Sequence, residues 1–132
     1  MQYQPTLSRA ALIELATRRY FASVDAKDLE ATLDCFHDEA LFCVQTSFTR
    51  HSGKAEIRRM FEDFFDGFEP IVHQDFVCTV DEANGRISAS FEAVLTGRDG
   101  SVTSLRNTNF WRVRDGKFQE VYVYMSGANV LV

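Results

Sequence analysis

The chain has 132 residues, of which 45% are hydrophobic and 25% charged, and it carries a net charge of −5. This length and balance predict a single globular domain over residues 1–132 that buries a real core. Adjacent basic residues form only the isolated pairs Arg18-Arg19 and Arg58-Arg59, and no apolar run approaches membrane-spanning length, so neither nucleic acid nor a membrane is an expected partner.

The chain begins with a predicted helix that Ser8 caps. Leu7 and Leu12 stand at the positions of a hydrophobic staple around this cap, and apolar residues then recur at helical spacing as far as Val24. The pattern breaks at residues 25–28, and a second, short helix is predicted near residues 28–36.

A short strand and a third helix follow. The apolar run over residues 40–44 predicts the strand. The third helix begins at Ser52-Gly53 and ends near Gly67 and Pro70. Its apolar residues fall on one face at i, i+3, i+4, i+7 and i+8, which is the pattern of an amphipathic helix: Ile57, Met60, Phe61, Phe64 and Phe65.

Three glycine turns divide the second half of the chain into strands. An Asn-Gly or Asp-Gly pair between alternating residues is the strongest short-range signal of a β-hairpin. The turns are Asn84-Gly85, Asp99-Gly100 and Asp115-Gly116, and the predicted strands cover residues 71–80, 86–97, 102–114 and 117–125. The expected fold class is therefore α+β, with three N-terminal helices packed on a curved, mostly antiparallel sheet around a pocket.

The two faces of this sheet differ in composition. If the helices pack on the face that carries Leu105, Trp111 and Val113, the opposite face carries aromatic side chains. An aromatic patch on an open sheet usually marks an interface, so we predict a homodimer through this face, centred on Phe110, Tyr122 and Tyr124.

Cysteine and histidine usage suggests no metal site. The three cysteines are odd in number and widely spaced, which predicts neither a disulfide framework nor a thiolate zinc site. His37 and His51 lie in polar, loop-like contexts and share no ligand spacing with His73. The cysteine pattern makes a reducing cytoplasm the expected compartment. No signal-peptide pattern is seen at the start.

The chain resembles the nuclear-transport-factor-2-like superfamily, in particular its SnoaL-like and ketosteroid-isomerase-like members. The resemblance runs over nearly the whole length and rests on RRYFASVDAKDLEATLDCFHDEALF, HSGKAEIRRMFEDFF and FWRVRDGKFQEVYVYMSGANV. It implies a cone-shaped fold around a pocket. The fold serves isomerases, dehydratases, cyclases, epoxide hydrolases and proteins without catalysis, so it does not choose a function.

The resemblance to ketosteroid isomerases gives counterparts for two of their three catalytic residues. Tyr20 matches their helix-one tyrosine, which donates a hydrogen bond to the substrate oxyanion, and Asn109 stands at the position of their second donor, an aspartic acid. The position of their catalytic carboxylate is Val44, with no carboxylate beside it. Steroid isomerisation by that mechanism is therefore not expected.

The catalytic residues of several dehydratase-like members have closer counterparts in this sequence. These members include scytalone dehydratase, a bile-acid dehydratase and a dehydrochlorinase. Their histidine–aspartate dyad matches His73 and Asp25. Histidine accepts protons near neutral pH, and a carboxylate holds its ring in one tautomer. With Tyr20 and Asn109 as hydrogen-bond donors, these residues would form a site for elimination or enolisation.

Each of these residues also has a purely structural interpretation. Asp25 is well placed to cap the second helix. Strand alternation groups His73 with Asp75, on the face opposite Phe76, so a bulge or strong curvature is needed to turn it inward. Tyr20 also fits an apolar helical stripe as a core aromatic.

Other residues are predicted to line the pocket. Two amides on an otherwise apolar strand face, Asn107 and Asn109, indicate a polar cavity, because buried amides without partners cost about 1–3 kcal/mol each. The remaining predicted lining residues are Trp111, Phe61, Val44, Val121 and Met125.

We therefore expect a cofactor-independent lyase or isomerase, without metal, that acts on a small hydrophobic carbonyl or hydroxyl compound. The alternative is a non-catalytic domain that binds a small apolar ligand or only dimerises, in which Asp25 and His73 do not meet.

Overall fold

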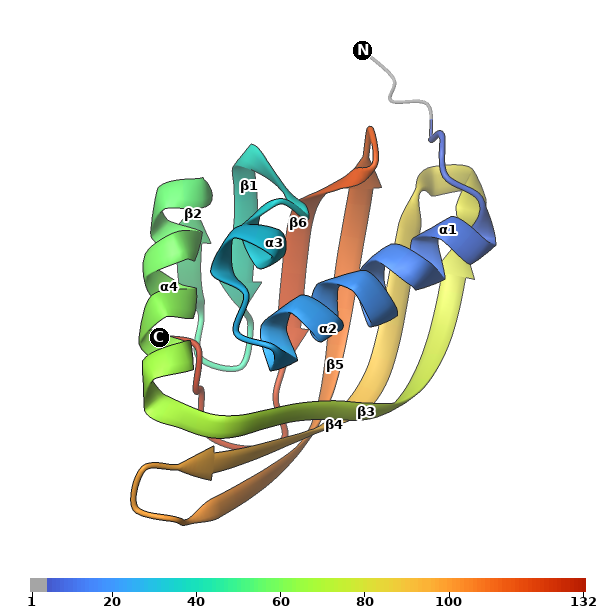
Figure 1. The fold of residues 1–132 in the computed structure, drawn as a ribbon. Helices are drawn as coiled ribbons and strands as arrows, with labels where there is room; N and C mark the ends of the chain where they lie inside the picture. Colours follow the sequence, from blue (N-terminus) through green and yellow to red (C-terminus); the bar gives the residue numbers. More distant parts are fainter. Residues whose placement is uncertain (1–4) are drawn as a thin grey trace.

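The structure is a computed structural model of the chain and describes residues 5–132. Five helical segments and six strands build an α+β fold in which helices cover one face of a curved sheet (Figure 1). In chain order the segments are α1 (Arg9–Ile13), η1 (Glu14–Arg19), α2 (Tyr20–Asp25), α3 (Leu29–Leu33), β1 (Phe36–Val44), β2 (Thr49–Ser52), α4 (Lys54–Gly67), β3 (Phe68–Asp81), β4 (Arg86–Gly97), β5 (Val102–Arg114) and β6 (Lys117–Tyr124), with one 3-10 turn, η2 (Glu82–Asn84), between β3 and β4. The predicted fold class is confirmed.

The six strands form one mixed sheet in the order β2-β1-β6-β5-β4-β3. All neighbouring pairs are antiparallel except β1 and β6, which are parallel. The three predicted glycine turns connect β3 to β6 as a meander. At the last of them Asp115 and Gly116 have φ values of 50° and 77°, the left-handed pair that a tight two-residue hairpin requires.

The first helix is continuous from Arg9 to Asp25 but contains a π-helical stretch, η1. Here the backbone N–H of Tyr20 donates to the carbonyl of Leu15, five residues earlier. Such insertions add one residue to a turn and rotate the following face, and they are frequent at functional sites. The stretch sets which way Tyr20 and the rest of α2 face.

A bulge interrupts β3 and reverses its side-chain alternation. Gln74 pairs with Glu92 and the next paired residue, Val77, with Ser90, so Asp75 and Phe76 together lie opposite Phe91. Asp75 has a φ of 60°, which a side-chain-bearing residue rarely adopts.

The reversal turns His73 inward. Ahead of the bulge, Ile71 and His73 face the helices; beyond it, Phe76 and Cys78 do. Regular alternation, which would have left His73 on the outer face, therefore does not hold along this strand.

Three further details differ from the sequence-based expectations. The second helix is shorter than expected, and its predicted last residue, Phe36, begins β1. Strand β2 was not predicted. It carries His51, which was expected in a polar loop but is only 2% exposed.

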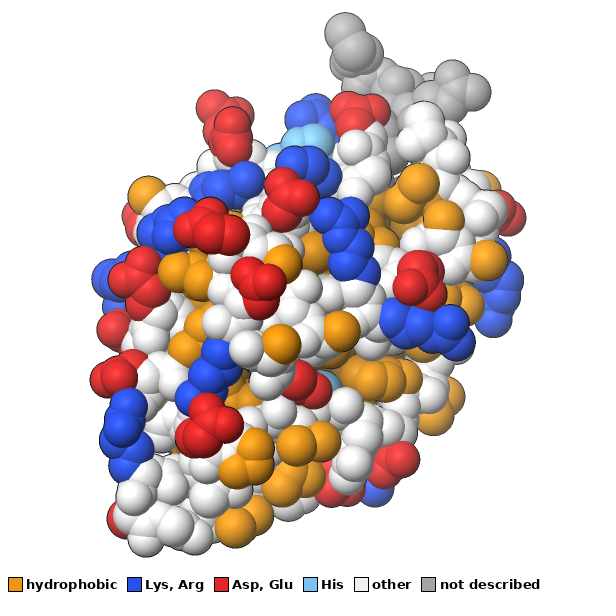
Figure 2. Space-filling view, in the orientation of Figure 1, with side chains coloured by type: hydrophobic (Ala, Val, Ile, Leu, Met, Phe, Trp, Pro, Cys, Tyr) orange, Lys and Arg blue, Asp and Glu red, His pale blue; other side chains and the backbone are white. Residues whose placement is uncertain are grey.

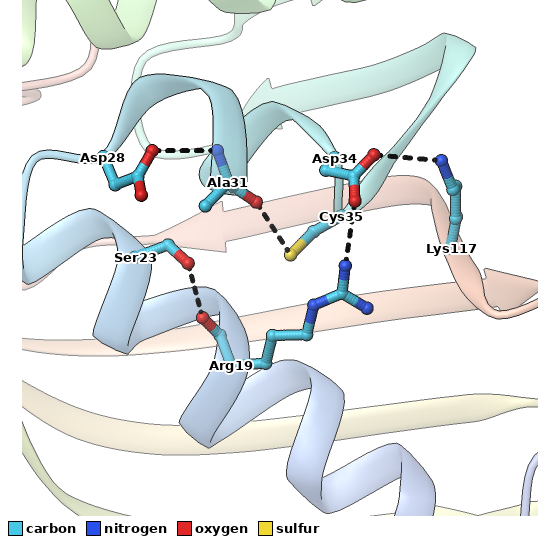
Figure 3. A network of polar contacts seen from close by, with 7 residues as sticks. All are labelled: Arg19, Ser23, Asp28, Ala31, Asp34, Cys35 and Lys117. Atoms are coloured by element: carbon cyan, nitrogen blue, oxygen red, sulfur yellow. Dashed lines mark hydrogen bonds and ion pairs between the residues drawn. The ribbon is translucent and has the colours of Figure 1, made fainter.

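A polar network ties the first helix to the α3 segment and the β5–β6 hairpin (Figure 3). The carboxylate of Asp34 pairs with Arg19 at 3.1 Å and with Lys117 at 3.5 Å. Arg19 directly precedes Tyr20, and its carbonyl also accepts from the Ser23 hydroxyl. These partly exposed pairs contribute little stability each, but they link the helix to the sheet at the β5–β6 hairpin.

The outer face of the sheet carries the predicted aromatic residues. Phe110 and Tyr124 are each 47% exposed, and their rings lie 5.8 Å apart, edge to face. On the helical side, Lys and Arg are interspersed with Asp and Glu (Figure 2). Within residues 5–132, no helix combines the length and apolar character needed to span a bilayer.

Candidate functional site

A cavity of about 30 Å³ lies between the helices and the inner face of the sheet. That volume holds about two water molecules. Aromatic and aliphatic side chains form most of its wall, and the polar groups are few. Its principal lining residues are Tyr20, Phe21, Val24, Phe42, Phe61, Phe64, His73, Phe91, Leu105, Asn107, Asn109, Val123, Met125, Val130 and Leu131.

His73 and Asp25 meet at the edge of this cavity. The Nδ1 of His73 lies 2.6 Å from Oδ1 of Asp25, and the backbone N–H of His73 donates to Oδ2 of Asp25 at 2.9 Å. Both carboxylate oxygens therefore hold the same residue. Since a carboxylate accepts hydrogen bonds, Nδ1 carries the proton, which leaves the lone pair of Nε2 free.

Aromatic rings pack around the imidazole. The side chain of His73 is 8% exposed and that of Asp25 is 27% exposed. Phe21 stacks on the imidazole at a centroid distance of 4.4 Å, and Phe91 lies tilted against it at 5.6 Å. The ring is thereby fixed in orientation and largely shielded from water.

Asp25 is available for this pairing because another residue caps the next helix. The carboxylate of Asp28 accepts from the backbone N–H of Ala31 at 3.1 Å and so caps α3. Asp25 is instead the last residue of α2, where no N-cap is needed. The capping interpretation of Asp25 is therefore wrong.

Tyr20 projects from the start of α2 into the aromatic core and lines the cavity. It is 2% exposed and lies edge-on to Phe118 at 5.3 Å and to Phe36 at 5.8 Å. Burial raises the pKa of Tyr20 well above its usual value, and the nearby Cys35 and Asp25 add to this increase. The phenol therefore stays protonated and able to donate a hydrogen bond throughout the neutral and mildly alkaline range.

Asn107 and Asn109 extend from β5 toward the cavity, with exposed fractions of 6% and 3%. Among the described residues, the Oδ1 of each amide is buried without a hydrogen-bond partner. Leaving a buried polar atom unpaired costs about 1–3 kcal/mol. Two such residues on one strand face indicate a site that is satisfied by water or ligand.

Three predicted lining residues do not line this cavity. Val44, Val121 and Trp111 are buried beside it in the packed core, where Trp111 pairs with Val121 across β5 and β6 and stacks on Phe118. Aromatic rings fill the core around Trp111, where it contacts Tyr20, Phe21 and Phe118. Of the predicted lining set, the cavity keeps Phe61, Met125 and Asn107. Three of the four proposed catalytic residues also line it: Tyr20, His73 and Asn109.

Several lining residues were not predicted. Phe91 shares the inward face of β4 with Ala89 and Ala93, so strand alternation signals it. Val130 and Leu131 follow the last strand and belong to no periodic pattern. Over residues 5–132, no group of three or more His, Cys, Asp or Glu side chains is arranged to hold a metal ion.

A comparison with known protein families identifies the family of this chain. A model of the SnoaL-like domain matches residues 17–121. The chain belongs to the SnoaL-like domain family. The resemblance inferred from sequence motifs is thereby confirmed, while no curated protein matches the chain in sequence.

Solved structures share the SnoaL-like fold. A candidate polyketide cyclase from Xanthomonas campestris pv. campestris is 19% identical, with a TM-score of 0.79 over 88% of this chain and 90% of that one. A candidate aromatic ring hydroxylase from Novosphingobium aromaticivorans is 25% identical, with a TM-score of 0.77 over 91% and 90%. A protein with a ketosteroid isomerase-like fold from Catenulispora acidiphila, solved with trimethylamine, is 12% identical, with a TM-score of 0.77 over 89% of each chain.

Proposed function

We propose that this SnoaL-like protein is a cofactor-independent lyase or isomerase, of the dehydratase or cyclase kind, that acts on a small hydrophobic carbonyl or hydroxyl compound. General acid–base catalysis needs a base that lies within reach of the proton and is fixed in one orientation. His73 meets this requirement, with Asp25 as the residue that positions it. Tyr20 and Asn109 supply hydrogen bonds to the oxygen on which negative charge develops.

The proton has a defined route in this proposal. Nε2 of His73 takes the proton from the carbon next to a carbonyl group, and the C–H electron pair forms the enolate. The enolate oxygen accepts from the Tyr20 hydroxyl and from the Asn109 amide. Isomerisation returns the proton to another carbon, whereas elimination gives it to a departing hydroxide, which leaves as water.

The observation that carries the proposal is the double contact of Asp25 with His73. The alternative, a domain that only binds a ligand, predicts that these two side chains lie apart. They lie 2.6 Å apart, with the imidazole at the cavity wall. The candidate cyclase among the structural neighbours is in keeping with this reaction class, although its likeness to this chain extends only to the fold.

The proposal is tested by exchange of the α-protons of ketones with D2O, which requires no knowledge of the natural substrate. Cyclohexanone and 2-tetralone are incubated with the protein, and loss of the α-proton signal is followed by NMR. The His73→Ala and Asp25→Asn variants are expected to lower the catalysed rate about 10²–10⁴-fold. His37→Ala, outside the cavity, serves as the control. Equal rates for wild type and His73→Ala would refute the assignment of the base.

We also propose that the protein pairs with a second copy of itself through the outer sheet face. The support is the adjacent exposed rings of Phe110 and Tyr124 on a face that no helix of the described chain covers (Figure 1). Large exposed aromatic patches are uncommon on monomers.

A further inference from the structure

The cavity is too small for the compounds that its lining suits. A volume of about 30 Å³ is well below the roughly 150 Å³ of a cavity that admits benzene, so a compound with fused rings needs more room than this cavity offers. Part of the wall must therefore move when a ligand binds. Most of the wall belongs to the sheet and to helices packed on it, where movement would break strand pairing or core packing.

One part of the wall is held differently. Residues 126–132, here called the closing segment, run from the end of β6 to α4 (Figure 1). Val130 and Leu131 of this segment line the cavity and pack on the core while remaining partly exposed. Among the described residues, the segment makes no backbone-to-backbone hydrogen bonds with the rest of the chain.

Hydrogen bonds that involve side chains hold the closing segment instead. Nε2 of His51 lies 3.1 Å from the carbonyl oxygen of Leu131. Asn129 of the segment donates from its amide to Ser47 at 2.9 Å, and within the segment its Oδ1 accepts from the backbone N–H of Leu131 at 2.8 Å. A few such bonds cost far less to break than a strand ladder.

His51 is built into this contact. It is 2% exposed, and Nη2 of Arg59 lies 3.4 Å from its Nδ1. Because a guanidinium only donates, Nδ1 accepts, and the single ring proton is on Nε2, facing Leu131. Arg59 is itself paired with Asp63 at 2.9 Å. Arg59 thus fixes the Nε2–H tautomer of His51, which is the one that can donate to the carbonyl of Leu131.

We propose that the closing segment sets the size of ligand that the cavity accepts, with Val130 and Leu131 as specificity-determining residues and His51 as the positioning residue that latches the segment shut. This inference rests on the proposed function only in taking the cavity as the ligand site. It requires no assignment of the base.

The size limit is tested with two probes that share a hydroxyl and an apolar ring system, phenol and 1-naphthol, by isothermal titration calorimetry. Leu131→Ala is expected to bind 1-naphthol at least tenfold more tightly than wild type, with phenol changed less than threefold. Leu7→Ala, another partly buried leucine that packs on the core away from the cavity, is the control. An unchanged preference between the two probes in Leu131→Ala would overturn the assignment of Leu131.

The latch is tested without a ligand, by amide hydrogen exchange. His51→Leu is expected to raise exchange at Leu131 at least tenfold and leave the amides of β4 and β5 unchanged. His51→Gln, whose amide can still donate to Leu131, should restore slow exchange. Equal exchange at Leu131 in His51→Leu and wild type would overturn the latch. If neither phenol nor 1-naphthol binds to wild type or to any variant, the cavity is not a ligand site, which counts against both the size limit and the proposed function. The exchange experiment would still decide whether His51 holds the closing segment in place.

Discussion

At the scale of single residues, the polar side chains of the site differ in whether a hydrogen-bond partner compensates for their burial. His73 is compensated by Asp25, whereas the amide oxygens of Asn107 and Asn109 are buried beside the cavity without such a partner among the described residues. This difference has measurable consequences for stability.

Tyr20 should make the protein sensitive to alkali. Its pKa is raised in the folded state, chiefly by burial, so above about pH 10 the unfolded chain loses a proton that the folded chain keeps. The free energy of unfolding should therefore fall as pH rises above 10, by up to about 1.4 kcal/mol per pH unit from this group.

Urea unfolding at pH 8 to 11 measures this effect. Tyr20→Phe should lose that part of the slope, whereas Tyr124→Phe, on the exposed outer face, should keep it. The same slope in wild type and Tyr20→Phe would show that Tyr20 ionises as readily in the folded protein as in the unfolded chain.

The buried, unpaired amide of Asn107 should lower the free energy of unfolding of the protein. Replacing a buried amide that lacks a partner with an apolar side chain of similar shape removes an unpaired polar atom. Asn107→Leu is expected to raise the free energy of unfolding by about 1–3 kcal/mol. The measurement is denaturant unfolding.

Thr32 is the matched control, because its buried hydroxyl does have a partner, the carbonyl of Asp28 at 2.8 Å. Thr32→Val should lower stability by about 1 kcal/mol. Destabilisation of similar size in both variants would mean that the Asn107 amide is well satisfied in solution.

At the scale of the elements, the sequence predicts what local physical rules determine. Ser8 as a cap and the three glycine turns are local signals that correspond to observed boundaries, and the apolar stripe of α4 corresponds to its buried face. Strand β2 escaped prediction because it has only four residues, mostly polar, and is defined by pairing with β1. The parallel pairing of β1 with β6 likewise depends on residues about 80 positions apart.

The site residues that could be predicted from the sequence are those that match a family motif. Tyr20, Asp25, His73 and Asn109 follow from the resemblance, but their meeting depends on the bulge at Asp75, for which the local sequence gives no glycine signal. Val130 and Leu131 were missed because they lie in an irregular segment whose position is set by side chains such as His51.

The bulge itself can be tested at Asp75. A β-branched residue tolerates a φ of 60° poorly, so Asp75→Val should lower the free energy of unfolding by about 1–2 kcal/mol. It should also slow ketone α-proton exchange, because His73 lies two residues away on the same strand. Thr79→Val, an exposed position of regular β3 backbone, should change stability by less than about 0.5 kcal/mol. A fully active and equally stable Asp75→Val protein would contradict the role given to the bulge.

At the scale of the whole molecule, one face of the sheet builds the pocket and the other is left open. If the open face pairs two copies, a charge placed there should separate them. Phe110→Glu is expected to sediment as a monomer at concentrations where wild type is a dimer. Phe48→Glu is the control, since Phe48 is 86% exposed but lies between β1 and β2. A wild-type protein that sediments as a monomer throughout would remove this proposal and leave the pocket unaffected.

The central claim is that His73 is held inside the cavity by Asp25 with its Nε2 free. The most direct measurement is a two-dimensional 1H–15N NMR spectrum of the histidine ring nitrogens at neutral pH, which distinguishes the two neutral tautomers. We predict that His73 is the Nδ1–H tautomer in wild type, with a slowly exchanging ring proton, and that Asp25→Ala abolishes this state. A His73 ring that is predominantly Nε2–H and exchanges rapidly with water in the wild-type protein would contradict the account.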